Sequence, residues 1–348
     1  MKTYSQAEKI AALVQEAQCI VVLQADNPDA DSLGSSLALE AVLGDMGKEV
    51  SLYCGVDVPE YLRYISGWDR VSKDLPQHFD VSIIVDASTR TLFEILEKNQ
   101  QFNWLATKPC IVLDHHALGD TPIDFASETI IDTEVASAGE LIYHVSQQLG
   151  WPVTVASGEP IMISILGDTQ GLTNDLAKPT TYQVMAELLE LGVSRVELEE
   201  RRREAGKMAL DIFRYKAKLI ERSEFYNDNR TALVTVPYDE IISYSPLYNP
   251  APLIQQDMLQ TKGVGIAIVL KAYPDKVTGA IRCNNGYPIA AELATKLGGG
   301  GHPYASGFKI TDGRSVGDIK AACLGLVTEL LATIPKQEQA DEVIQYSF

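Results

Sequence analysis

The feature that most constrains this chain is the alternation, in its first 114 residues, of short continuous apolar runs with segments of helical periodicity. The apolar runs have the length and composition of buried strands and occupy residues 19–24, 49–54, 81–86 and 110–114. Segments with apolar residues at helical spacing occupy 5–17, 33–46 and 91–100. This order predicts an α/β domain with a mainly parallel sheet flanked by helices. Ligands bind such a sheet beyond the carboxyl ends of its strands.

The rest of the chain predicts a helical part, a charged part and a second α/β part. Residues 136–192 have mostly helical patterns and complete the first domain. The charged segment that follows has too little apolar surface for a core and predicts a helical linker at 193–222. Beyond it lie predicted strands at 231–236, 263–273 and 277–283 and predicted helices at 289–297 and 316–334. We therefore expect domains at 1–192 and 223–348, the second with a hairpin at its last two long strands.

Composition limits the classes of partner. A chain of 348 residues with 46% hydrophobic content is long enough to bury two cores. The net charge of −18 repels long duplex nucleic acid everywhere except at a local basic or metal-filled pocket, but it leaves small anionic substrates available. The five cysteines form no CxxC pair, which indicates a reducing cytoplasm rather than a disulfide framework or a zinc knuckle. No apolar run reaches membrane-spanning length, so we expect no membrane association.

Acidic and histidine residues gather at the predicted strand and helix ends. They are Asp26, Asp29, Asp31, Asp86, Asp114, His115, His116 and Asp168. Carboxylates that lie close together repel one another unless a cation or a helix N-terminus neutralises them, so a divalent metal is the natural partner. Each residue alone also fits a structural role, such as a helix cap, a turn residue or a satisfied core histidine. Their coincidence at one predicted sheet edge favours a metal site.

The motifs DxD at 29–31, VDAS at 85–88, DHH at 114–116 and GDT at 167–169 resemble, in this order, those of the DHH phosphoesterase superfamily. The later GGGGH at 298–302 resembles the glycine-rich motif of the companion DHHA1 domain. Together the motifs span nearly the whole chain. The layout is similar to the NrnA-type nanoRNase and pAp phosphatase branch rather than to the larger RecJ-like exonucleases. The resemblance implies an N-terminal DHH domain, a smaller C-terminal DHHA1 domain and an active site in the cleft between them.

Carried over residue by residue, the resemblance implies two divalent ions in one active site. Asp29 and Asp86 would form one site, and Asp86 would bridge to the second site, formed with Asp31, His115 and Asp168. Manganese is the expected metal, with magnesium or cobalt as alternatives. Such a pair activates a water molecule at neutral pH and stabilises the phosphoryl oxygens. His116 would contact the phosphate or protonate the leaving oxygen, so Asp86 and His116 are the predicted catalytic residues.

One position departs from the family pattern. The family usually has a histidine four residues before the first aspartate of the DxD pair, and this chain has Ala25 there. The first metal site therefore lacks an expected ligand. Asp26 is adjacent and offers an oxygen that suits manganese or magnesium. We expect activity to survive with a more weakly held first metal.

The second domain supplies the predicted substrate-binding residues. Glycine has no Cβ, so Gly299, Gly300 and Gly301 allow the backbone to approach an anion closely. Arg282 offers a fork for a second phosphate or a plane for a base, and His302 offers a further phosphate contact. Without the upstream motifs, the glycines would indicate only a flexible loop, and Arg282 only a surface ion pair.

These residues together predict an enzyme that hydrolyses short single-stranded oligonucleotides, such as pApA, or the small nucleotide pAp. A manganese-dependent pyrophosphatase of the same superfamily is one alternative, although pyrophosphate has no base or sugar for a glycine-rich second domain to hold. A non-catalytic nucleotide-binding or regulatory protein is the other alternative, and Ala25 is the feature in its favour. A homodimer is expected only by resemblance.

Overall fold

The computed structural model describes residues 2–117, 121–244 and 249–334. The chain divides into two compact units, residues 1–207 and 208–348, and each has its own hydrophobic core. The segment predicted as a linker contributes to both units. Its helix α8 (Arg195–Ala205) lies in the first unit, and its helix α9 (Leu210–Arg222) lies in the second. Residues 335–348 of the predicted second domain lie outside the described residues.

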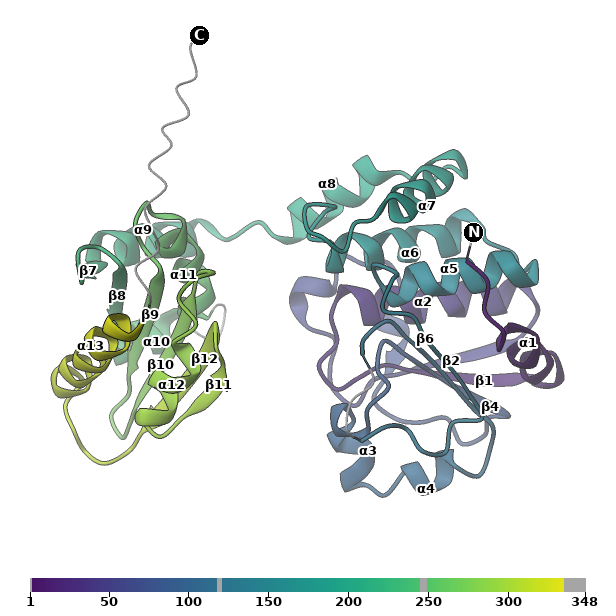
Figure 1. The fold of residues 1–348 in the computed structure, drawn as a ribbon, viewed down its shortest axis with the longest axis horizontal. Coiled ribbons are helices and arrows are strands. Elements are labelled where there is room, and N and C mark those ends of the chain that lie inside the picture. The colour runs from purple at the N-terminus through teal and green to yellow at the C-terminus, as the bar shows by residue number, and fades with distance from the viewer. Residues whose placement is uncertain (1, 118–120, 245–248, 335–348) are drawn as a thin grey trace, which may run out of the picture. The chain divides into compact units, whose positions relative to one another are not determined.

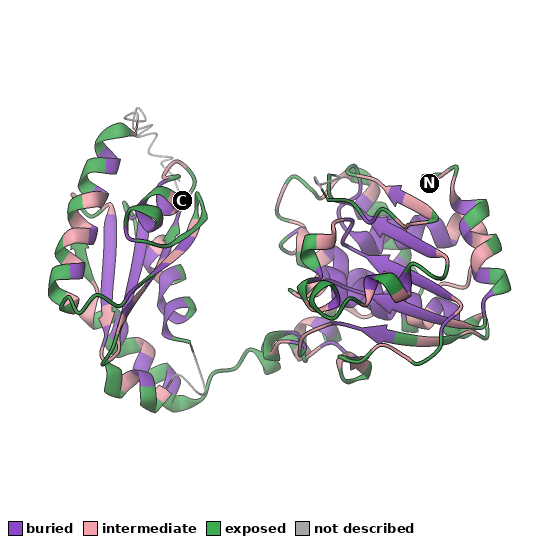
Figure 2. Ribbon diagram, turned by 90° about the horizontal axis from the view of Figure 1, so that it is seen from below, coloured by how far each residue is buried: buried purple, intermediate pink, exposed green. Residues whose placement is uncertain are grey.

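The first unit is built on a six-stranded parallel sheet with the strand order β3-β2-β1-β4-β5-β6. Its strands are β1 (Cys19–Leu23), β2 (Glu49–Tyr53), β3 (Val71–Ser72), β4 (Val81–Val85), β5 (Cys110–Asp114) and β6 (Glu128–Ile131). Strands β4 and β5 are buried along their whole length, as continuous apolar runs of a parallel sheet should be (Figure 2). The predicted α/β fold with a mainly parallel sheet is confirmed.

Helices cover both faces of this sheet (Figure 1). Side chains such as Ile20 and Val22 pack with the larger group of helices, whereas Val21 and Leu23 point to the other face. The larger group comprises α1 (Ala7–Glu16), α2 (Ala30–Asp45), α5 (Ala138–Leu149), α6 (Val155–Asp168) and α7 (Pro179–Glu190). The opposite face carries the short helices α3 (Glu94–Lys98) and α4 (Phe102–Leu105). The single helix predicted at 91–100 is instead a 3-10 turn (Arg90–Leu92) followed by α3.

Helices α2 and α6 approach each other closely at Gly34. A Cβ at this position would lie 2.6 Å from the carbonyl oxygen of Pro160 and 3.2 Å from Cβ of Ser164. The first distance is too short for any larger residue without a backbone shift, and the second is tight. The close approach places the carboxyl half of α6 beside the beginning of α2, where the DxD aspartates lie.

The second unit contains a mixed six-stranded sheet with the order β11-β12-β10-β9-β8-β7. Its strands are β7 (Glu224–Tyr226), β8 (Thr231–Val236), β9 (Ile266–Ala272), β10 (Val277–Cys283), β11 (Gly300–His302) and β12 (Ala305–Ile310). Its helices are α9, α10 (Tyr238–Tyr244), α11 (Pro250–Gln260), α12 (Ala290–Lys296) and α13 (Val316–Thr333). Strands β9 and β10 pair antiparallel, which confirms the predicted hairpin. Of the helices that the structure describes, none has both the length and the apolar character needed to cross a membrane.

Candidate active site

The predicted metal ligands of the first unit converge at the carboxyl ends of β1, β4 and β5. Asp31 lies in the first turn of α2 shortly after β1, Asp86 follows β4, His115 follows β5, and Asp168 is the last residue of α6. The Nε2 atom of His115 lies 3.0 Å from Asp168 Oδ2, 3.3 Å from Asp31 Oδ2 and 3.5 Å from Asp86 Oδ1. Three of these four side chains are nearly inaccessible to solvent. The sequence motifs, which span more than 130 positions, thus form one cluster.

Asp29 is the N-cap of α2, and its carboxylate accepts a hydrogen bond from the backbone N–H of Ser32. The hydroxyl of Ser32 accepts in turn from the backbone N–H of Asp29, which completes a capping box. Asp29 therefore serves as a helix cap, which was the structural alternative for these aspartates. Asp31 lies inside the helix and does not cap it. The negative charge of Asp29 still acts on the cluster, because it contributes to the raised pKa of Asp86.

Asp31 is fully buried and held by four donors. Its Oδ1 atom accepts hydrogen bonds from the hydroxyls of Ser164, at 2.6 Å, and Ser35, at 2.9 Å. The backbone N–H of Gly139 lies 3.3 Å from the same oxygen, and that of Ala138 donates to Oδ2 at 2.8 Å. These two N–H groups belong to the first turn of α5, where the helix dipole favours a negative charge. With Oδ1 occupied by three donors, Oδ2 is the oxygen that faces His115.

Asp86 adopts a left-handed backbone conformation, with φ of 56°, directly after β4. This conformation is uncommon for a residue with a side chain, although aspartate tolerates it better than most, and it is frequent at functional sites. Burial raises the pKa of Asp86 well above its usual range, and the charge of Asp31 adds to the effect. Burial likewise raises the pKa of Asp31, with a further contribution from Asp168. Both carboxylates therefore need a positive partner to remain ionised.

Of the two histidines beside these carboxylates, His115 contacts three of them, whereas His116 reaches Asp86 at 3.4 Å. Burial lowers the pKa of His115, but its interactions with Asp168 and Asp86 outweigh burial and raise the pKa to about 11. Nevertheless, neither His115 Nε2 nor Asp86 Oδ1 makes a hydrogen bond of normal geometry to any described residue. The two buried atoms lie 3.5 Å apart. A divalent cation bound by both atoms would satisfy them, so the donor set fits a metal.

Two groups of ligand atoms in this cluster are close enough to hold an ion. One consists of Asp31, His115 and Asp168, and the other consists of Asp86, His115 and His116. All the donors are carboxylate oxygens or imidazole nitrogens, which suit manganese, magnesium or cobalt. The chemistry of the donors thus agrees with a divalent-metal centre.

His116 is oriented by Asp114, the last residue of β5. Asp114 Oδ1 lies 3.0 Å from Nδ1 of His116 and accepts a hydrogen bond from its backbone N–H at 3.1 Å. Burial alone would raise the pKa of Asp114, but the hydrogen bonds from His116 and Ser88 lower it below its usual value. The hydrogen bond to Asp114 raises the pKa of His116. Because 60% of the His116 side chain is exposed, its ring can reach a bound molecule while Asp114 fixes its orientation.

The loop after α6 supports Asp168. The side-chain amide of Asn174 donates to the backbone carbonyl of Asp168 at 2.8 Å. Gln170, Gly171 and Leu172 follow with positive φ angles of 51°, 79° and 71°. Such a conformation at a residue as large as leucine is strained, and it turns the chain sharply beside the cluster.

The side chains of Ala25 and Asp26 make their contacts on the α3–α4 side of the sheet. The side chain of Ala25 is buried in the hydrophobic cluster on the α3–α4 face of the sheet. The Oδ2 atom of Asp26 accepts a hydrogen bond from the backbone N–H of Ile95, at the beginning of α3. Its Oδ1 atom faces Gly55, where an added Cβ would approach it to 2.2 Å. Asp26 belongs to neither group of metal-ligand atoms found here among the described residues.

The predicted substrate-binding residues of the second unit share one row of its sheet. Arg282 on β10 and His302 on β11 both pair with Ala305 on β12, which lies between them. Directly paired residues project from the same face, so the two side chains lie on one face roughly 10 Å apart. Arg282 also lines a cavity of about 430 Å³ together with Gln255, Gln256 and Asn284.

The glycines beside this row have a clear structural role. A Cβ at Gly299 would lie 2.1 Å from the carbonyl oxygen of Gly307, and Gly301 has a φ of 140°. The segment Gly300–His302 is exposed along its length. Glycine is thus required for β11 to pair closely with β12, whatever the segment binds.

Sequence reasoning missed Ser164 and the first turn of α5. The hydroxyl of Ser164 also lies 2.8 Å from that of Ser137 and accepts from the backbone N–H of Gly139, so it links Asp31 to that turn. The signal available was a serine inside the otherwise apolar run at 161–166 of a buried helix. A polar residue at such a position needs a partner, but the sequence does not say which one.

Comparison with known proteins agrees with this geometry. Residues 19–166 match the DHH family, N-terminal domain. The chain is 25% identical over 285 residues to the bifunctional oligoribonuclease and PAP phosphatase NrnA of Thermus thermophilus, with 81% of each protein covered. It is 22% identical over 304 residues to the protein of the same name from Bacillus subtilis, covering 85% of this chain and 92% of that protein.

Solved structures share the fold. An exopolyphosphatase-related protein from Bacteroides fragilis has a TM-score of 0.76 at 21% identity, with 94% of this chain and 98% of that chain covered. The exonuclease RecJ bound to manganese has a TM-score of 0.53 at 15% identity, with 96% of each chain covered.

Proposed function

We propose that this chain is a divalent-metal-dependent hydrolase of phosphate esters, because its residues 19–166 match the DHH family, N-terminal domain. The substrates that we propose are very short single-stranded oligonucleotides, such as pApA, and the nucleotide pAp. Relatives named as oligoribonucleases and PAP phosphatases, similar over 81% or more of this chain, support this choice. The strongly acidic composition supports a small substrate over a long duplex.

One observation carries the proposal. The carboxylates of Asp31, Asp86 and Asp168 all lie within 3.5 Å of Nε2 of His115. Several buried carboxylates at one point are costly for a folded protein unless a cation compensates them. Asp31, Asp86, His115 and Asp168 are the proposed ligands of one ion, and Asp29 with Asp86 the proposed ligands of a second. Bound divalent ions supply charge stabilisation for the phosphoryl oxygens and a nucleophile at neutral pH.

The exposed ring of His116 suits a role next to the metal ligands. Asp114 accepts the hydrogen bond of Nδ1, so the other ring nitrogen is available to the substrate. The raised pKa of His116 keeps the ring protonated to a higher pH than usual. We therefore assign His116 to contact the phosphate and donate a proton to the leaving oxygen.

The second unit supplies substrate recognition in this proposal. Arg282 and His302, which project from one row of the sheet, would bind a second phosphate of the substrate. The glycines from 299 to 301 would let the backbone approach that phosphate. The reducing cytoplasm is the proposed compartment, which suits five free cysteines.

The test is the hydrolysis of pApA to AMP by the full-length protein, with and without manganese, in parallel with pAp and pyrophosphate. We expect manganese-dependent release of AMP from pApA and its loss in Asp86→Asn. Hydrolysis of pyrophosphate alone would move the function to a pyrophosphatase. If folded protein bound nucleotide but turned over none of the three substrates, the enzymatic proposal would be refuted.

Ala25 supports a second candidate, a nucleotide-binding protein without catalytic activity. Ala25 is buried at the position where the family usually has a histidine. The carboxylate of the adjacent Asp26 accepts a hydrogen bond from α3 instead. Ala25→His separates the candidates, because a weakened first site predicts tighter manganese binding and faster turnover in the variant. Unchanged affinity and turnover would contradict our account of the first site.

A further inference from the structure

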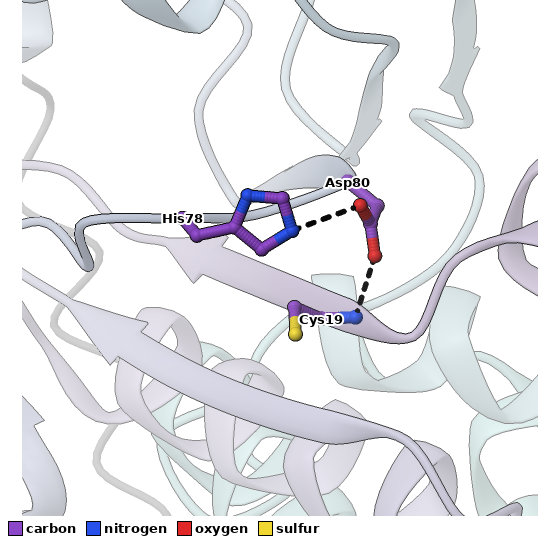
Figure 3. A group of neighbouring side chains, drawn as sticks. All are labelled: Cys19, His78 and Asp80. Atoms are coloured by element: carbon purple, nitrogen blue, oxygen red, sulfur yellow. Dashed lines mark hydrogen bonds and ion pairs between the residues drawn. The ribbon is translucent and has the colours of Figure 1, made fainter.

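A second group of metal-ligand side chains lies at the opposite edge of the parallel sheet. Cys19 is the first residue of β1, Glu49 is the first residue of β2, and Asp80 directly precedes β4. Strand β1 pairs in parallel with both β2 and β4, so the amino ends of all three strands meet at one edge. His78 joins them from the segment that leads into β4 (Figure 3).

The ligand atoms of this group are close together. His78 Nε2 lies 3.2 Å from Asp80 Oδ1, and Cys19 Sγ lies 3.5 Å from Glu49 Oε2. Ligand atoms of Cys19, His78 and Asp80 all lie within 4.8 Å of one another. Five-residue strands separate this edge from the candidate active site by roughly 15 Å. The two groups therefore cannot share an ion.

Asp80 is already fixed in place by the backbone. Its Oδ2 atom accepts hydrogen bonds from the N–H groups of Gln18 and Cys19, both at 2.9 Å. These bonds leave Oδ1 directed toward His78, as Figure 3 shows. The side chain of His78 is 65% exposed and that of Cys19 is partly exposed, so both can adjust to a ligand without disturbing the core.

We propose that Cys19, His78, Asp80 and Glu49 form a zinc site at the amino edge of the sheet. A thiolate, an imidazole and carboxylates are the donors that zinc takes in a tetrahedral site, with bond lengths of about 2.0–2.3 Å. Tetrahedral bonds of that length place neighbouring donors roughly 3.3–3.8 Å apart, close to the two distances of 3.2 and 3.5 Å found here. Glu49 lies outside the set of Cys19, His78 and Asp80 and would turn toward the ion by rotation of its exposed side chain.

The donors also separate this site chemically from the active site. A thiolate favours zinc and other soft metals, whereas the carboxylate-rich cluster at the other edge favours harder ions such as manganese. With all four protein ligands in place, the zinc site has no open position for a substrate, so its role is structural. It would tie together the beginnings of β1 and β2 and the segment before β4.

Cobalt is the probe that distinguishes this site. Cobalt bound by a thiolate shows sulfur-to-metal charge-transfer absorption, which the carboxylate and imidazole ligands of the other cluster cannot produce. We expect the metal-free full-length protein to develop this absorption when cobalt is added beyond the two equivalents that the candidate active site can take, and zinc to abolish it. The absorption should persist in Asp86→Asn and vanish in Cys19→Ser. No absorption in the wild-type protein, or absorption retained in Cys19→Ser, would overturn the proposal.

A second measurement leaves the thiol in place. Zinc should protect Cys19 from alkylation by iodoacetamide, read by mass spectrometry of the Cys19 peptide. His78→Gln and Glu49→Gln should each raise the zinc concentration needed for protection at least about tenfold. Asp57→Asn, which alters an exposed carboxylate of the same unit paired with Lys73, is the matched control and should change nothing. Equal protection in all of these variants would also overturn the proposal.

Discussion

The two predicted functional regions of this protein differ in how much the fold constrains them. In the first unit, Asp31, Asp86 and His115 are buried against one another, and their pKa values are strongly shifted. In the second unit, Arg282 and His302 project from an exposed row of a sheet. Buried charge destabilises a fold unless it is compensated, whereas an exposed arginine costs little. The buried, compensated charges of the first unit suit a catalytic site, and the exposed charges of the second unit suit substrate recognition.

The largest effect is expected from Asp86→Asn, which removes one charge from the buried cluster without changing its size. We expect turnover of pApA to fall at least about a thousandfold, because the proposed bridging ligand between two ions is lost. The metal-free protein should not lose stability, since burial already disfavours the charged form of Asp86. Steady-state kinetics and thermal unfolding without metal measure the two effects. A variant with wild-type turnover would remove Asp86 from the chemistry.

Ser164→Ala tests whether the support of the cluster matters as well as its ligands. Loss of the hydroxyl removes the shortest of the four hydrogen bonds that hold Asp31, and we expect manganese affinity to fall about 10- to 100-fold. Ser146→Ala is the matched control, because Ser146 is also a buried serine but makes no hydrogen bond to a described residue. Titration calorimetry with manganese gives both affinities. Equal affinities in the two variants would show that Ser164 only fills space.

Arg282→Ala tests the recognition role of the second unit. We expect KM for pApA to rise about 10- to 30-fold with kcat changed less than about threefold, because a charge-assisted contact to a phosphate away from the reacting one is lost. Arg282→Lys should recover part of the loss, since it restores the charge but not the fork. A fall in kcat with unchanged KM would place Arg282 in the chemical step instead.

The effect that is smallest per step of the measurement is the dependence of manganese affinity on pH. The pKa of His115 near 11 means that the ring is protonated at pH 7 in the metal-free protein, and a metal ligand must be neutral. Binding should therefore release a proton, and affinity should rise with pH by at most about tenfold per pH unit between pH 6 and 9. Calorimetry in buffers of different ionisation enthalpy counts the protons. Affinity independent of pH would show that His115 is neutral before the metal binds.

Local patterns predicted the sheet of the first unit well. Local patterns gave the bounds of β1, β2, β4 and β5 to within one residue. Strands β1, β4 and β5 are buried on both faces and so have an unmistakable composition. The edge strand β6 was not predicted, since ETII at 128–131 is short and only partly buried. The predicted ligands Asp31, Asp86, His115 and Asp168 do meet, because parallel strands bring their carboxyl ends to one edge.

What the sequence by itself determined, then, was the order of strands and helices and the sheet edge at which the acidic motifs gather. Only the tertiary structure decided that Asp26 turns to α3, that Ser164 and the first turn of α5 hold Asp31, and that Arg282 and His302 flank Ala305. The physical reason is range. Strand burial and helix periodicity depend on the types of residues that are neighbours in the sequence. These contacts join residues up to 133 positions apart, and they depend on how closely whole elements pack.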